Sequence, residues 1–166
     1  MERYSHLGTV ERHAVRSTSD GPPGGHPGSG VLYAATTIST CAAEVFQHDR
    51  LIDTAAGTPY LTGWRPTRPL PLLDLTSSWA IRHGAADALN TAPRAVCRTW
   101  AREIRTRLPE LDGMRVRSTM TGEPNVVLWG PGLTMFPADP TFHRPLTAAP
   151  WRTLRRVAEQ IGYDIE

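Results

Sequence analysis

Apolar positions along the chain recur with two spacings, that of an α-helix and that of a β-strand. Helices are predicted over Ser39–Arg50, over Pro93–Leu108 and from Pro150 onward, because apolar residues recur there every three or four positions. The apolar stripes of the last two are Val96, Trp100, Ile104 and Leu108, and Trp151, Leu154, Val157, Ala158 and Ile161. Short apolar runs bounded by turn residues predict strands at Val31–Ala35, Leu70–Leu75, Arg115–Thr119, Asn125–Trp129 and Tyr163–Ile165.

These helices and strands do not alternate in the regular βαβ order of a parallel sheet, so an α+β fold is expected. A length of 166 residues suits one compact domain over residues 1–166, with mixed sheets flanked by helices. Its densest loop is predicted at residues 17–30, where Gly and Pro occupy eight of the fourteen positions. Gly63–Pro69 and the proline-rich surroundings of His143 are also predicted to be loops.

The charge balance argues against a protein that coats nucleic acid, so no direct nucleic-acid partner is expected. Eighteen basic residues, all of them arginine, face sixteen carboxylates, and the formal net charge is +2. The absence of lysine has a simple origin in a GC-rich codon usage, and it also means that each fixed cation is a planar fork able to grip phosphate or carboxylate.

No apolar run approaches the ~20 residues of a membrane span, and Met1–Val10 lacks the pattern of a secretory signal. We therefore expect a cytoplasmic protein without a membrane partner. Its oligomeric state stays open, a homo-oligomer included.

The chain contains almost none of the common catalytic or metal-binding sequence motifs. The six histidines do not have H-E-x-x-H spacing, and the two cysteines, Cys41 and Cys97, are too few for a zinc knuckle or a disulfide scaffold. A G-x-S-x-G elbow is absent, and a lysine-free chain has no phosphate loop ending in Lys-Ser/Thr. Neither a metal site nor a serine hydrolase is expected.

Several connected blocks do resemble one family. Tyr33 in Val31-Leu-Tyr-Ala-Ala is followed eleven residues later by Glu44 in Thr40-Cys-Ala-Ala-Glu-Val-Phe. Further blocks follow in order: Leu72-Leu-Asp-Leu, Ala92-Pro-Arg with Trp100-Ala, Gly113-Met-Arg-Val-Arg-Ser118 and Asn125-Val-Val-Leu-Trp129. In this order and spacing, roughly residues 1–135 resemble the RES-domain family.

The resemblance implies an ADP-ribosyltransferase-like fold and a bacterial toxin that destroys NAD. Such toxins cleave the nicotinamide–ribose bond by phosphorolysis or hydrolysis, so NAD is the substrate, phosphate is a candidate co-substrate and no resident cofactor is implied. An Xre-type antitoxin is the implied protein partner. Transfer of ADP-ribose to a protein acceptor is a variant that the sequence does not separate from these reactions.

The resemblance also implies roles for individual residues. Glu44 would stabilise the cationic ribose or hold one of its hydroxyls, and Tyr33 would pack against nicotinamide or bond the ribose. Ser118 would contact the nicotinamide-side ribose or a phosphate. Arg3, with Tyr4 beside it, would bind the pyrophosphate.

The second arginine that the family places shortly before the tyrosine strand is missing. This chain has Gly24-Gly-His26-Pro there, so a protonated His26 or Arg16 would have to replace it. A weakened RES scaffold that binds a nucleotide or a protein without turnover is therefore the alternative function.

Without the family, each of these residues has a simpler interpretation. Tyr33 in an apolar strand would more often be a core residue, and Glu44 would lie on a solvated helix face. Arg3 would be a surface charge near a terminus, and Ser118 a neutral strand position.

Overall fold

The computed structural model describes residues 2–4, 7–11, 31–85, 89, 92–135, 137, 139–149 and 151–166. The side chains of residues 2–4, 7–11, 94, 131, 133 and 134 are not part of this description. The glycine- and proline-rich stretch at 17–30, with His26 in it, lies outside the described residues, as does Arg16.

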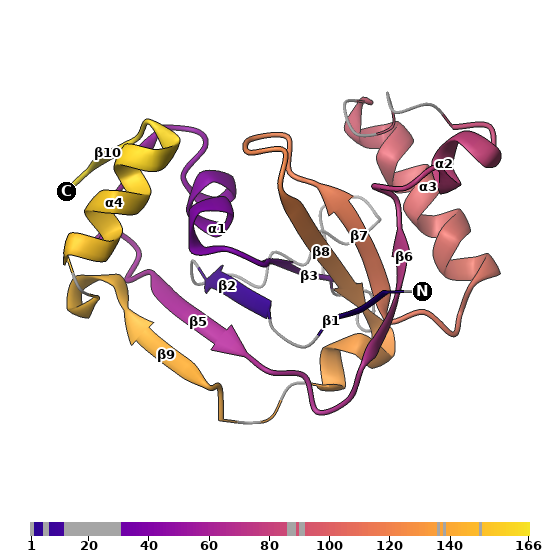
Figure 1. Ribbon diagram of the computed structural model, residues 1–166, viewed down its shortest axis with the longest axis horizontal. Helices are drawn as coiled ribbons and strands as arrows, with labels where there is room; N and C mark the ends of the chain where they lie inside the picture. The colour runs from indigo at the N-terminus through magenta and orange to yellow at the C-terminus, as the bar shows by residue number, and fades with distance from the viewer. Residues whose placement is uncertain are drawn as a thin grey trace.

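One mixed sheet of eight strands organises the fold, in the order β1-β6-β7-β8-β3-β2-β5-β9 (Figure 1). Its strands are β1 Glu2–Tyr4, β2 Leu7–Glu11, β3 Val31–Ala35, β5 Tyr60–Trp64, β6 Leu70–Asp74, β7 Gly113–Arg117, β8 Pro124–Trp129 and β9 Phe142–Pro145. All neighbours in the sheet are antiparallel except β6 and β7, which run parallel. A second, two-stranded sheet pairs β4 Leu51–Ile52 with β10 Asp164–Ile165.

The helices are α1 Ile38–Val45, α2 Trp79–Arg82, α3 Arg94–Arg107 and α4 Trp151–Ile161, with 3-10 turns η2 Gly130–Met135 and η3 Leu146–Ala148. Together with the mixed sheet they confirm the predicted α+β class. No helix among the described residues has the length and apolar content needed to cross a membrane.

Two separate groups of helices cover the same face of the large sheet. Residues opposite one another in antiparallel strands share a face, so the register from β5 through β2 and β3 to β8 places Leu61 and Val127 on one side. Leu61 packs in a cluster with residues of α1 and α4, such as Phe46, whereas Val127 packs with Ile104 of α3. Strands β3 and β8 lie between the two groups (Figure 1).

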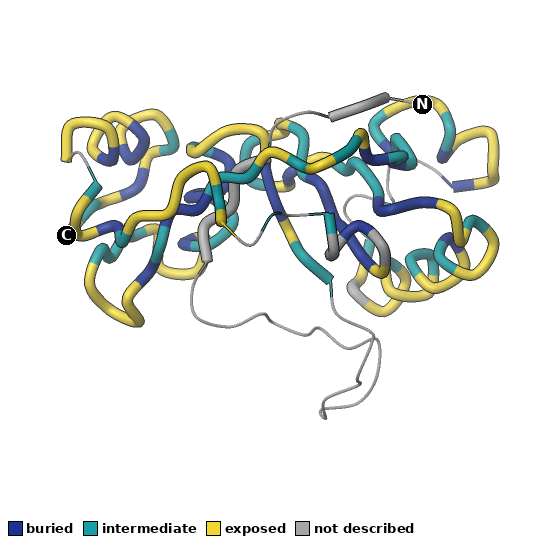
Figure 2. Tube along the Cα trace, turned by 90° about the horizontal axis from the view of Figure 1, so that it is seen from below, coloured by how far each residue is buried: buried dark blue, intermediate teal, exposed yellow. Residues whose placement is uncertain are grey.

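The opposite face of the central strands has its own apolar cluster, formed by Ala34, Leu70, Leu72, Val126 and Leu128. Met135 of η2 packs against it. Figure 2 shows buried positions along the strands and on one side of the helices, with exposed residues on the connecting segments. Both faces of β3 and β8 are therefore involved in packing, which holds these strands firmly where the candidate site begins.

Two strands occupy segments for which loops are predicted. β9 contains His143 and pairs with β5, and β5 ends at Trp64, inside the segment from Gly63 onward. His143 Nδ1 lies 2.9 Å from Thr62 Oγ1, and its ring stacks on Tyr60. The loop prediction for the surroundings of His143 is therefore wrong, because pairing with a distant strand overrides the weak local propensity of Phe142–Pro145.

Two helical predictions also need correction. The first helix ends at Val45 rather than Arg50, because the chain turns over residues 47–50 and Arg50 has a left-handed φ of 51°. Val96 and Trp151 are exposed although both belong to predicted apolar stripes, since each lies near the start of its helix.

Candidate active site

Glu44 lies in the last turn of α1, which follows β3 directly. The helix starts at the cap residue Thr37, whose hydroxyl accepts a hydrogen bond from the Thr40 backbone N–H at 3.2 Å. Residues 40–43 are buried and hold α1 against the sheet and α4. Glu44 itself is half-buried. Glu44 is therefore partly exposed at the surface of α1 and partly enclosed by its neighbours.

Two side chains from distant parts of the chain bind the same oxygen of Glu44. Ser118 Oγ donates to Glu44 Oε1 at 2.6 Å, and Asn125 Nδ2 donates to the same oxygen at 2.9 Å. No hydrogen bond within the described part of the chain reaches Oε2. The carboxylate is thus anchored through one oxygen and presents the other.

Ser118 follows β7 and starts the turn that leads into β8. Its hydroxyl accepts from the backbone N–H groups of Met120 and Thr121, each at 3.1 Å, and only 3% of the residue is exposed. Two accepted bonds and one donated bond use the whole capacity of a hydroxyl. This arrangement suits a residue that orients Glu44, rather than the contact with ribose or phosphate expected from the resemblance.

Asn125 was not predicted to be functional, although it lies in the block Asn125-Val-Val-Leu-Trp129. It is the second residue of β8 and lies opposite Ala35 in β3. The signal that could have found it is an amide on a strand whose other members from Val126 to Trp129 are all apolar and buried.

Tyr33 lies in β3 opposite Val127, on the same face of the sheet as Asn125. Tyr33 and Asn125 are diagonal neighbours on adjacent strands, and residues in this relation typically lie about 7–8 Å apart. Tyr33 is 58% exposed, so the interpretation as a core residue is wrong. An exposed aromatic ring in the middle of a sheet is available for contact with a flat ligand.

A family model for the RES domain matches residues 11–151. The chain belongs to the RES-domain family. No curated protein and no solved structure matches it, so the likeness to ADP-ribosyltransferases stays a prediction. The matched part contains Tyr33, Glu44, Ser118 and Asn125, and it extends beyond the expected limit near residue 135.

Two of the predicted pyrophosphate contacts of this RES domain lie in its first strand. Arg3 and Tyr4 precede the matched residues, and their backbones lie in β1 opposite Pro71 and Leu70. β1 is an edge strand of the sheet, yet only two residues separate it from β2, which pairs with β3. The Cα atoms of Tyr4 and Leu7 are therefore at most about 11 Å apart. The side chains of Arg3 and Tyr4, and all of His26, are outside the described residues.

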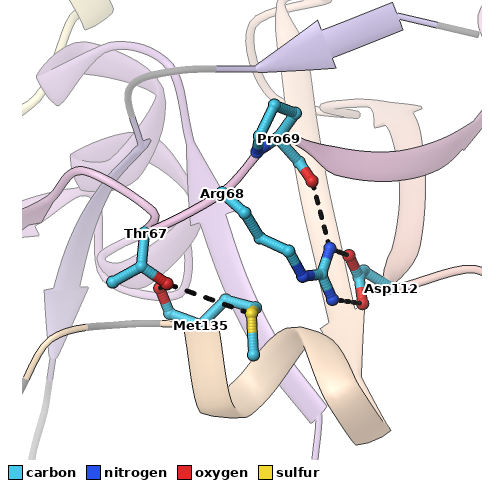
Figure 3. Close-up of polar contacts among 5 residues, drawn as sticks. All are labelled: Thr67, Arg68, Pro69, Asp112 and Met135. Atoms are coloured by element: carbon cyan, nitrogen blue, oxygen red, sulfur yellow. Dashed lines mark hydrogen bonds and ion pairs between the residues drawn. The ribbon is translucent and has the colours of Figure 1, made fainter.

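The RES domain also contains a bidentate ion pair that sequence reasoning missed. Arg68 donates to both carboxylate oxygens of Asp112, with 2.8 Å between Nη2 and Oδ1, and to the Pro69 carbonyl (Figure 3). The hydrogen bond to Asp112 raises the pKa of the Arg68 guanidinium, against an opposing effect of burial. Asp112 is only 1% exposed, so the guanidinium balances a buried charge.

This ion pair is structural. Asp112 precedes β7 and Ser118 follows it, so the two residues are six positions apart, which spans about 20 Å of extended chain. The pair connects the segment before β6 to the start of β7 and lies away from Glu44.

Proposed function

We propose that this RES domain cleaves the bond between nicotinamide and ribose in NAD. The observation that carries the proposal is the Glu44 carboxylate, anchored through Oε1 and open at Oε2, on the sheet face where Tyr33 is exposed. Membership of the RES family supports the substrate.

The reaction needs few catalytic groups. When the C–N bond breaks, its electron pair stays on the nicotinamide nitrogen, which leaves as a neutral base and needs no proton. The ribose left behind resembles an oxocarbenium ion, as in glycoside hydrolysis, and a nearby carboxylate stabilises its charge. Glu44 Oε2 supplies this charge, or holds a ribose hydroxyl so that the cation forms in place.

A nucleophile then completes the reaction. Water or phosphate forms a new C–O bond at the same carbon and releases a proton, giving ADP-ribose or its 1-phosphate. Both acceptors remain candidates, as does a protein side chain, because each attacks the same cation.

The remaining residues would orient the partners. Ser118 and Asn125 fix the direction of the Glu44 carboxylate, so that little reorganisation is needed at the moment of reaction. Tyr33 would pack its ring against the nicotinamide or bond the ribose through its hydroxyl.

Nicotinamide release from NAD by the purified protein, with and without phosphate, tests the proposal. Glu44→Gln keeps the acceptor oxygen for Ser118 and Asn125 and removes only the charge, so we expect kcat to fall about 100- to 1000-fold. Glu103→Gln is the matched control, because Glu103 is exposed on α3 and pairs with the exposed Arg107 one turn along the same helix. Equal release by the Glu44→Gln variant, or none by the unmodified protein, would contradict the proposal.

A binding module without turnover is the second candidate. Gly24-Gly-His26-Pro stands where RES proteins carry an arginine, and one lost charge-assisted contact weakens binding roughly ten- to hundredfold. Calorimetric titration with NAD that shows binding but no nicotinamide release would favour this candidate.

For the biological role, we propose a toxin held in check by an Xre-type antitoxin. Growth arrest on induction, reversed by co-expression of a neighbouring helix-turn-helix protein, is the expected result. Growth unaffected by the induced protein would count against a toxin.

A further inference from the structure

Helix α1 makes a second polar contact with the turn that carries Ser118. Thr40 Oγ1 lies 3.0 Å from Thr121 Oγ1, and Thr40 is only 1% exposed. This contact involves neither Glu44 nor Ser118, and nothing in the proposed chemistry requires it. A buried hydroxyl pair at this position therefore needs an explanation of its own.

The hydrogen bonds around Thr40 continue back to the start of the helix. The Thr37 hydroxyl donates to Thr40 Oγ1 at 2.9 Å, and either hydroxyl of the Thr40–Thr121 pair can be the donor. Thr121 Oγ1 accepts from the Glu123 backbone N–H at 3.3 Å. The helix cap and the turn are thus joined by one continuous chain of hydrogen bonds.

The two contacts between α1 and the turn form a closed ring. Thr40 and Glu44 are four residues apart and share one side of α1, about one helical turn from each other. On the other side, the Thr121 N–H donates to Ser118 Oγ. The ring runs from Thr40 to Glu44, to Ser118, to Thr121 and back to Thr40.

A ring of hydrogen bonds of this kind restricts rotations and shifts of α1 that apolar packing alone would allow. The far side of α1 packs in an apolar cluster with α4, and Tyr163 Oη donates to the Ala43 carbonyl there. Apolar contact holds a helix in place but has no direction, so it tolerates small rotations and shifts. Two hydrogen bonds one turn apart resist both movements.

We propose that Thr40 and Thr121 are positioning residues for Glu44. Their hydroxyl contact sets the rotation of α1 against the β7–β8 turn, so that Oε1 meets Ser118 and Oε2 keeps its direction. This inference rests on the proposed function, because it assigns the contact to the same site.

Steady-state kinetics of NAD cleavage test the inference with Thr40→Val and Thr121→Val, which keep the side-chain shape and remove the hydroxyl. Each variant loses a hydrogen bond that aligns the carboxylate in the transition state, so kcat falls about tenfold while KM stays within about twofold. Thr40→Ser restores the hydroxyl and kcat. The double variant is no worse than either single one, because both remove the same contact.

Thr62→Val is the matched control. Thr62 is equally buried, at 1% exposed, and bonds His143 from the face of β5 opposite to α1. It should lower the urea midpoint about as much as Thr40→Val and leave kcat unchanged. An unchanged kcat in Thr40→Val, an equal fall in Thr62→Val, or no recovery in Thr40→Ser would each overturn the inference.

A second measurement separates this inference from the proposed function. If the unmodified protein releases no nicotinamide, the proposed function fails, and hydrogen exchange of the Met120 and Thr121 amides then decides on the contact. Faster exchange in Thr40→Val than in Thr62→Val supports a contact that holds the turn against α1. Equal exchange overturns it.

Discussion

At the scale of single residues, the direction of one carboxylate depends on two donors far away in the chain. Ser118 and Asn125 are 74 and 81 residues from Glu44, and both bind Oε1. Hydrogen bonds to a charged group contribute about 1.5–3 kcal/mol each. Losing either hydrogen bond therefore loosens the orientation of the carboxylate, and with it the position of Oε2. Neither donor is expected to touch the substrate.

Asn125 offers the sharpest test at this scale. Asn125→Ala removes one donor, and we expect kcat for NAD cleavage to fall about tenfold. Asn125→Asp replaces the donor by a second carboxylate beside Glu44, so like-charge repulsion should lower kcat further at neutral pH. Steady-state kinetics of the two variants, compared at equal folded fraction, measure both effects. An Asn125→Asp variant as active as the unmodified protein would contradict the role of Asn125.

At the scale of elements, the pairing of β7 with β8 positions both donors to Glu44, because Ser118 follows β7 and Asn125 lies in β8. Gly113 is the first residue of β7 and lies opposite Leu128 in β8. A Cβ atom at Gly113 would approach the Val127 carbonyl oxygen to 2.3 Å, which is inside the contact distance. The close approach of these two strands therefore requires glycine at that position.

Gly113→Ala should destabilise the protein by about 1–3 kcal/mol or more, because the backbone of β8 has to move. Urea unfolding followed by circular dichroism gives the free energy of unfolding. Gly63→Ala is the matched control in β5, where the added Cβ would meet only Phe142 Cβ at an ordinary 3.7 Å, and we expect a change within about 0.5 kcal/mol. Similar stability of the two variants would refute the close approach of β7 and β8.

At the scale of the whole molecule, helices cover the two ends of one sheet face and leave Tyr33 exposed between them. α1 and α4 pack at one end, and α3 packs at the other (Figure 1). A ligand on Tyr33 and Glu44 would contact the sheet and the first helical group together. Binding should therefore stabilise the folded protein as a whole.

Thermal unfolding of the Glu44→Gln variant with NAD measures this stabilisation while turnover is slowed about 100- to 1000-fold. At about 100 times the Kd, linkage predicts about 2.7 kcal/mol, which raises Tm by roughly 5–10 °C for a chain of this size. Tyr33→Ala should reduce the shift and leave the Tm of the free protein nearly unchanged, since the side chain is exposed. A Tm that does not respond to NAD at any concentration would rule out this binding site.

The parts that could be predicted are those with a local signal. The apolar periods of α3 and α4 and the apolar runs of β3, β6 and β8 place these elements within a few residues of their bounds. β5 and β9 escaped prediction, because their residues form strands only by pairing with each other and with β2. The exposure of Val96 and Trp151 could not be predicted for a similar reason. An apolar stripe shows which side of a helix is apolar, but it does not show how far the neighbouring element extends along that helix.

The α+β class, the main elements and the RES family could all be inferred from the order of residues along the chain, as could the spacing of eleven residues between Tyr33 and Glu44. These follow from short-range patterns, which local backbone preferences and motif order encode. The folded arrangement was needed to show that Ser118 and Asn125 converge on one oxygen of Glu44 and that Tyr33 is exposed. It was also needed to show that Arg68 pairs with Asp112. Such contacts join residues tens of positions apart, and strand register and helix docking bring them together only when the whole core is packed.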